Sequence, residues 1–133
     1  MSNEKNREVI VPAGLEALYE DWHFAPAVRH GDILYISGII GANEVLEVSP
    51  EPEQQFVQVF ETMAHTLQAA GADFGDLVEL TSYHVALNAH FSVFAAVKDR
   101  YCKEPYFAWT AIGVSDLLLP GALVEVKAVA HLS

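Results

Sequence analysis

Hydrophobic positions along the chain change between the spacing of strands and that of helices. Residues 31–41 form the most apolar stretch, rich in β-branched and aromatic residues with glycine at both ends, which predicts a buried central strand. Gly31-Asp32 is a turn signal, so residues 27–30 are expected to pair with residues 33–36 as a hairpin. Ser37-Gly38 interrupts the run, either as a bulge whose hydroxyl binds neighbouring backbone or as a point of close approach for a ligand.

Two segments have helical spacing. A helix is expected to begin near residues 49–53, which combine a serine cap candidate, two prolines and acids, and to run to about Ala70 before Gly71. Its apolar face comprises Phe56, Val59, Phe60, Met63, Leu67 and Ala70. A second helix is predicted over residues 89–102, capped by Asn88. Its inward side chains are expected to be Phe91, Phe94, Ala95, Val97 and Tyr101.

The remaining apolar runs predict further strands, at residues 9–12, 77–85, 106–114 and 122–132. Residues 14–21 predict a helical turn or a loop, and residues 1–8 predict a flexible tail of one domain spanning 1–133. This order predicts an α+β fold in which two helices cover one face of a sheet. The opposite face stays partly apolar, so an oligomer is expected.

Composition limits the class of protein. Of 133 residues, 52% are hydrophobic and 19% are charged, which is typical of a globular domain. No apolar run approaches the roughly 18 residues of a membrane span, and the polar N-terminus does not resemble a signal peptide. A formal charge of −11 argues against nucleic acid as a partner. The single cysteine, Cys102, fits a cytoplasmic location and is predicted to be buried and structural.

Few residues suggest chemistry by pattern alone. Glu125 and Lys127 share one face of the last strand, either as a surface pair or with Glu125 in an interface cleft as a base. Trp22 and Phe24 either clamp the N-terminal segment or line a pocket. The six histidines lack the spacing of metal ligands, so no metal is expected.

Three segments resemble the RidA/YjgF family in the right order and spacing: residues 31–38, residues 67–71 running into 74–78, and residues 119–130. The resemblance covers residues 24–130. It implies a chorismate mutase-like fold and a homotrimer whose sheets face inward, with small-molecule pockets at the subunit interfaces. It also implies hydrolysis of enamines or imines, such as 2-aminoacrylate, without a cofactor.

The resemblance assigns site residues only in part. Ser37 and Glu125 match the family's catalytic serine and glutamate. The binding positions differ: Phe24 replaces a tyrosine, Ile39 a glutamine, Ala95 an asparagine, Trp109 the substrate-binding arginine and Ala111 a cysteine.

Loss of the arginine removes a bidentate partner for a carboxylate, unless Arg29 or a histidine substitutes for it. The changed pocket therefore favours a neutral or aromatic ligand. Two functions stay open: a divergent deaminase, or a trimeric binding module without catalysis.

Overall fold

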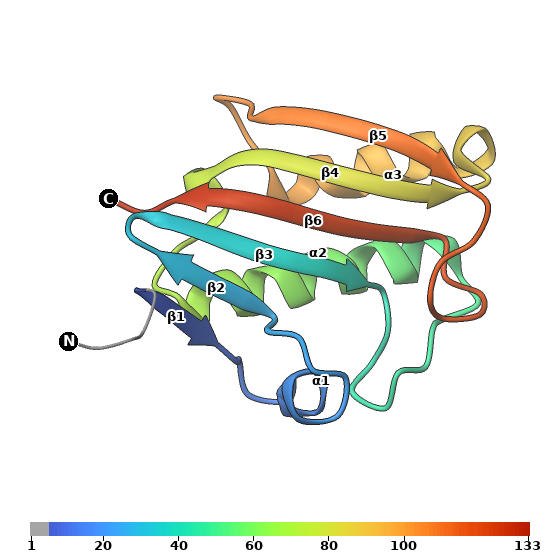
Figure 1. Cartoon of the computed structure of the whole chain (residues 1–133). Helices are drawn as coiled ribbons and strands as arrows, with labels where there is room; N and C mark the ends of the chain where they lie inside the picture. The colour runs from blue at the N-terminus through green and yellow to red at the C-terminus, as the bar shows by residue number, and fades with distance from the viewer. Residues whose placement is uncertain (1–5) are drawn as a thin grey trace.

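The computed structural model describes residues 6–133 and contains one mixed sheet with its two long helices on the same face (Figure 1). The strands are β1 (Arg7–Ile10), β2 (Ala27–His30), β3 (Ile33–Ile40), β4 (Leu77–Val85), β5 (Ala108–Val114) and β6 (Val124–His131). The helices are α1 (Glu16–Glu20), α2 (Pro52–Ala69) and α3 (Leu87–Tyr101), with a 3-10 turn at Phe74–Asp76. The sheet order is β1-β2-β3-β6-β4-β5, and only β4 and β5 run parallel. The predicted α+β fold is confirmed.

The central hairpin forms as the sequence predicts. Ala27 pairs with Ile36 and His30 with Ile33, and Gly31 turns the chain with a φ of +62° that favours glycine. The register between β3 and β6 then shifts between Ile36 and Ile39. The Ser37-Gly38 interruption is therefore a bulge, which bends the strand next to its partner β6.

The core lies between the sheet and the two long helices. The predicted apolar face of α2 contributes Phe56, Phe60 and Met63, all fully buried. Phe94 of α3 meets Phe56 edge-on, with ring centroids 5.3 Å apart. Such aromatic contacts stabilise the pairing of α2 with α3 beyond the area they bury.

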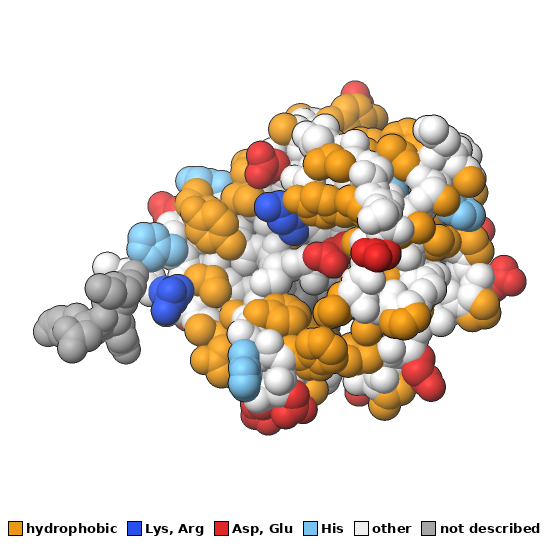
Figure 2. All heavy atoms as spheres, turned by 45° about the vertical axis from the view of Figure 1, so that its right-hand side comes forward, with side chains coloured by type: hydrophobic (Ala, Val, Ile, Leu, Met, Phe, Trp, Pro, Cys, Tyr) orange, Lys and Arg blue, Asp and Glu red, His pale blue; other side chains and the backbone are white. Residues whose placement is uncertain are grey.

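The opposite face of the sheet has no helix over it. Along β6, Glu125 and Val129 alternate with fully buried residues and so point away from the helices. Tyr35 and Ile112 share this face through the strand register, and they remain 51% and 40% exposed. Lys127 and its register partner Thr81 lie on this face too. Figure 2 shows hydrophobic side chains interspersed with charged ones on the visible surface. The sheet face is therefore uncovered and partly apolar, as expected.

Two boundaries differ from prediction. Residues 1–5 of the expected tail lie outside the described residues, but Arg7 and Glu8 belong to β1, because their backbone pairs with β2. Asn88 does not cap α3. The helix begins at Leu87, two residues earlier than predicted, after Ala86, whose left-handed backbone (φ 55°) reverses the chain at the end of β4.

The last two predicted strands start late. The strand expected from Tyr106 begins at Ala108, and the one expected from Ala122 begins at Val124. In both cases, the two residues before the strand are apolar but belong to the preceding loop. Their composition alone does not distinguish them from residues that form the hydrogen bonds of the sheet.

Candidate functional site

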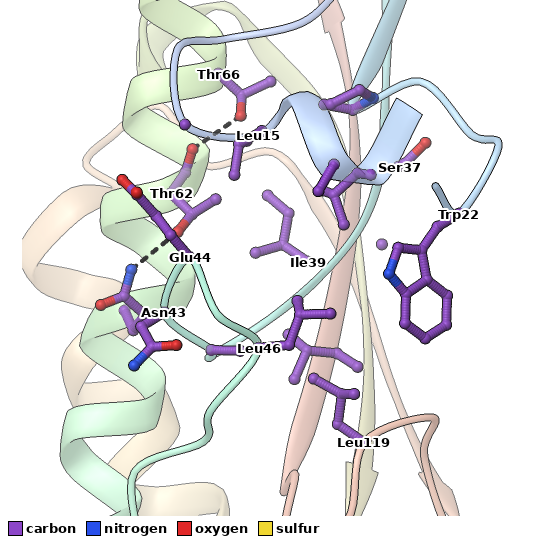
Figure 3. A pocket seen from close by; sticks show the side chains of 18 of the residues that line it. Leu15, Trp22, Ser37, Ile39, Asn43, Glu44, Leu46, Thr62, Thr66 and Leu119 are labelled. Atoms are coloured by element: carbon purple, nitrogen blue, oxygen red, sulfur yellow. Dashed lines mark hydrogen bonds between the residues drawn. The ribbon is translucent and has the colours of Figure 1, made fainter. Parts of the chain in front are cut away.

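A cavity of about 740 Å³ opens beside the bulge of β3 (Figure 3). Its position follows from strand lengths. The short strand β2 pairs only with the first half of β3, so the second half has no strand on that side. The chain around α1 and the loop over residues 42–46 close over this gap, and α2 forms the far wall.

The cavity is mainly apolar, with polar groups contributed by several elements. Its hydrophobic residues include Leu15, Leu18, Ile39, Leu46 and Leu119. On α2, the Thr66 hydroxyl donates to the Thr62 carbonyl at 2.9 Å, and the Gln58 amide donates to the Thr62 hydroxyl at 3.1 Å. Apolar walls with a few oriented polar groups are typical of small-molecule sites.

Glu125 reaches this cavity across the bulge. A Cβ atom on Gly38 would lie 2.1 Å from Glu125 Oε2, so the carboxylate occupies the space that any other residue at position 38 would fill. Within residues 6–133 this carboxylate makes no hydrogen bond or ion pair, including with Lys127. The alternative of a Glu125–Lys127 surface pair is therefore wrong, and the group nearest to Gly38 is the Glu125 side chain, not the ligand or backbone that the sequence suggested.

The Ser37 hydroxyl donates its proton to a backbone carbonyl. Its Oγ donates to the Ala25 carbonyl at 2.6 Å, and its amide donates to the Pro26 carbonyl at 3.0 Å. These bonds hold the segment before β2 against the bulge. Ser37 lines the cavity but has only oxygen lone pairs to offer a ligand, so it can accept a hydrogen bond there.

Phe24 and Ile39 also line this cavity, as does Trp22. His65, predicted to be solvated, is exposed but lies at the cavity wall, where its Nε2 is 2.8 Å from the Ala13 carbonyl. Arg29 does not belong to the described lining residues, and its Nε donates to the Gly31 carbonyl instead.

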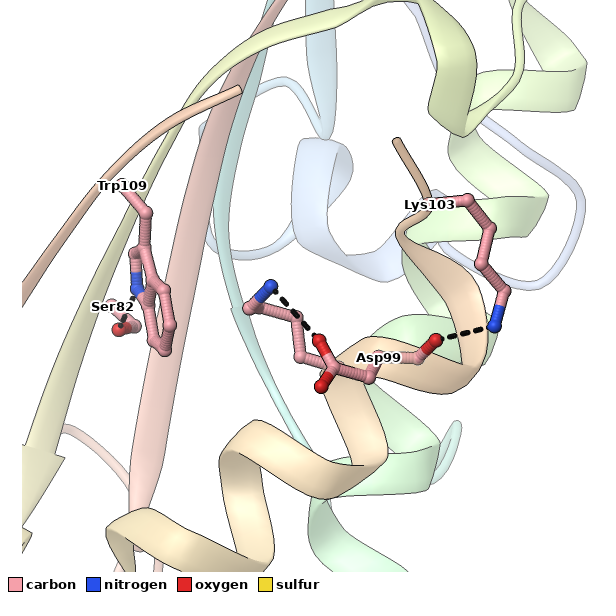
Figure 4. Close-up of polar contacts among 5 residues, drawn as sticks. Ser82, Asp99, Lys103 and Trp109 are labelled. Carbon is pink, nitrogen blue, oxygen red and sulfur yellow. Dashed lines mark hydrogen bonds and ion pairs between the residues drawn. The ribbon is translucent and has the colours of Figure 1, made fainter. Parts of the chain in front are cut away.

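The other three predicted binding residues lie elsewhere. Trp109 and Ala111 are on β5 and Ala95 is on α3, and none of them lines the cavity. Trp109 faces α3 and not the uncovered sheet face. Its Nε1 donates to Ser82 Oγ at 3.0 Å (Figure 4). Its ring stacks on Phe91, with the ring centroids 5.4 Å apart.

The sequence did not indicate two ionisable side chains that lie beside Trp109. Lys98 is only 6% exposed, and its Nζ lies 4.7 Å from the Trp109 ring centroid. His84 is fully enclosed, with Nε2 2.7 Å from Ser82 Oγ and no partner for Nδ1, and burial lowers its pKa. The available signal for Lys98 was its i+4 spacing from Phe94, which places it on the buried face of the helix.

Charge in the cavity is one-sided. Its lining includes the carboxylates of Asp21, Glu44, Glu61 and Glu125, and no lysine or arginine from the described part of the chain. Among the described lining residues, His65 is the only basic side chain.

Other reactive groups contribute little. Burial raises the pKa of the Cys102 thiol to about 11, so this cysteine is a poor nucleophile at neutral pH. Over residues 6–133, no group of three or more histidine, cysteine or acidic side chains is placed to hold a metal ion. Nor does any helix in that range have the length and apolar character needed to cross a membrane.

Comparisons with known proteins identify the family. The family model described as Endoribonuclease L-PSP matches residues 15–132. The chain is 35% identical to the RutC family protein YjgH of Escherichia coli, with 95% of each chain covered. It is 32% identical to the 3-aminoacrylate deaminase RutC of Acinetobacter baylyi, covering 94% of this chain and 98% of that one.

A solved structure of Protein YJGH superposes with a TM-score of 0.88 at 34% identity, covering 96% of this chain and 97% of the other. RidA from a Psychrobacter species superposes with a TM-score of 0.77 at 30% identity, covering 82% and 88%. Together with the matched fold, these similarities show that the chain belongs to the Endoribonuclease L-PSP family, which contains the YjgF/RidA and RutC proteins.

Proposed function

We propose that this protein hydrolyses a small enamine or imine and releases ammonia, with Glu125 as the catalytic base. The observation that carries this proposal is the unpaired Glu125 carboxylate, held over Gly38 at the wall of the cavity. The two relatives whose names include deaminase activity on 3-aminoacrylate and on 2-iminobutanoate support the reaction class.

The chemistry needs only water and a proton acceptor. Glu125 takes a proton from water as the water oxygen bonds to the C=N carbon and the C=N π electrons move to nitrogen. The imine nitrogen is protonated at the start, so this addition gives a neutral carbinolamine. Glu125 then returns its proton to the nitrogen, the hydroxyl proton passes to solvent as the carbonyl forms, and the C–N bond breaks to release ammonia. An enamine follows the same route after it has tautomerised to the imine. A positioned carboxylate that first accepts and then returns a proton accounts for both steps.

The proposed site lies between two protomers of a homotrimer. The uncovered apolar sheet face and the separation of the site residues into two groups support this arrangement. One group surrounds Glu125. The other, on α3 and β5, would come from the adjacent protomer and close the pocket over its open side.

A binding module without catalysis is the second candidate. The bond from Ser37 to the Ala25 carbonyl favours it, because it withholds the Ser37 hydroxyl proton from a ligand. The apolar residue at Phe24 adds no polar group there.

The test is imine hydrolysis with wild type beside Glu125→Gln. An amino-acid oxidase generates imines from alanine and from phenylalanine, and semicarbazide traps whatever imine is not hydrolysed. Wild type should reduce the trapped product, and Glu125→Gln should lower this activity about 100-fold or more. Glu20→Gln, an exposed change on α1, serves as the matched control. Equal activity of Glu125→Gln and wild type, or an inert wild type with both imines, would favour the binding module.

A further inference from the structure

The surface formed by α3 and β5 contains a buried lysine between two aromatic rings. Lys98 is 6% exposed, and its Nζ lies 4.7 Å from the Trp109 ring centroid and 5.4 Å from that of Phe107. Lysine is rarely buried to this extent without a partner. A lysine in this position is therefore expected to bind an anion.

The protomer alone does not provide that partner in full. The one ion pair of Lys98 is with Asp99 Oδ1 at 3.5 Å, and the Asp99 side chain is 70% exposed. Solvent screens such a pair, so it adds little. Within residues 6–133, none of the three N–H donors of the Lys98 ammonium makes a hydrogen bond.

The location of Lys98 matches the charge that the site lacks. The cavity around Glu125 has four carboxylates and no lysine or arginine from the described residues. Trp109 occupies the position of the family's arginine, and the Lys98 ammonium lies over its ring. A cation is therefore still present at this place, supplied by α3 instead of β5.

We propose that Lys98 binds the carboxylate of the ligand while Trp109 and Phe107 contact its planar part. The ligand class is thus a carboxylate with a planar unsaturated part that can lie against the two aromatic rings. This inference rests on the interface pocket of the proposed function.

A pair of probes that differ in charge alone tests it. Benzoate and benzamide share a planar ring, and only benzoate offers a carboxylate to Lys98. Titration calorimetry is carried out with wild type, Lys98→Met, which keeps the aliphatic stem, and Lys98→Arg, which keeps the charge. Lys103→Met is the matched control, because this exposed lysine donates to the Asp99 carbonyl away from the rings.

Wild type should bind benzoate more tightly than benzamide. Lys98→Met should weaken the binding of benzoate about 10- to 100-fold and leave the affinity for benzamide unchanged. Lys98→Arg and Lys103→Met should keep the preference for benzoate. The inference is overturned if wild type does not prefer benzoate, or if Lys98→Met retains that preference with its fold and oligomeric state intact. Affinity is measured here without turnover, so this result is independent of whether Glu125 hydrolyses imines.

Discussion

At the scale of single residues, Gly38 and Glu125 form one functional unit. The absence of a side chain at position 38 gives the Glu125 carboxylate its place at the cavity wall. The atoms that a Cβ would meet are the end of a flexible side chain and not backbone. A substitution there should therefore move the carboxylate without disturbing the strands.

Gly38→Ala should accordingly remove activity and spare stability. We expect imine hydrolysis to fall about as far as in Glu125→Gln, while the free energy of unfolding changes by no more than about 1 kcal/mol. Urea denaturation beside the trapping assay measures both. Full activity in Gly38→Ala would show that Glu125 does not act from this position.

Gly41 provides the contrast. A Cβ there would lie 2.2 Å from the backbone oxygen of Gln55, so β3 and α2 would have to separate. Gly41→Ala should cost about 2 kcal/mol of stability or more in the same urea experiment. Equal stability of the two alanine variants would contradict this difference between side-chain and backbone contact.

At the scale of elements, the hydrophobic periodicity predicted the helices and strands that are long enough to show several repeats. The face of α2, the hairpin at Gly31 and the bounds of β4 at residues 77–85 agree with the structure. The five-residue helix α1 and the four-residue strand β1 have too few turns or alternations to be distinguished from loop. Their positions depend on tertiary contacts.

The candidate site was predicted less completely. Ser37 and Glu125 were found through the bulge signal and the resemblance, and both reach the cavity. The face that Trp109 presents could not be read from a strand whose alternating positions are apolar on both sides. Its orientation is set by pairing with Leu80 of β4. Lys98 was missed because a lone lysine on a helix usually lies in solvent.

Gln55 shows how α2 is fixed to the sheet. Its buried amide donates to the Ser49 and Gly121 carbonyls at 2.8 and 2.9 Å and accepts from the Leu123 amide at 2.9 Å. One side chain thus joins the start of the helix to the loop before β6. Glu125 lies two residues beyond Leu123, so this contact also supports the site.

Gln55→Glu should loosen this connection. A carboxylate can still accept from Leu123 but cannot donate to the two carbonyls, so we expect a loss of about 2–3 kcal/mol in unfolding free energy. Gln54→Glu places the same charge on the exposed side of the helix and should leave stability within about 0.5 kcal/mol of wild type. Similar stability of the two variants would show that the Gln55 bonds are not needed.

At the scale of the whole molecule, one side of the sheet requires a partner. The face that includes Tyr35 and Ile112 is partly apolar and has no helix over it. Burial of such a face against copies of the same chain is the simplest closed arrangement. The proposed trimer would cover it and bring α3 and β5 of one protomer toward Glu125 of the next.

A charge on this face should therefore break the assembly. Sedimentation equilibrium should give wild type the mass of three chains, and Tyr35→Asp should shift it toward one chain. Gln68→Asp, on the exposed side of α2, should stay trimeric. A monomeric wild type would contradict the shared site, whereas a trimeric Tyr35→Asp would place the interface elsewhere.

The most direct test of a shared hydrolytic site is to mix two impaired variants, with the imine kept below the concentration that saturates wild type so that weaker binding also lowers the rate. Glu125→Gln damages one half of each pocket and Lys98→Met the other. In trimers refolded from equal amounts of both, about one quarter of the interfaces should combine an intact Glu125 with an intact Lys98. Imine hydrolysis should then recover to about one quarter of the wild-type rate. If the mixed trimers are no more active than the two parents, the site does not lie between protomers and the account is wrong.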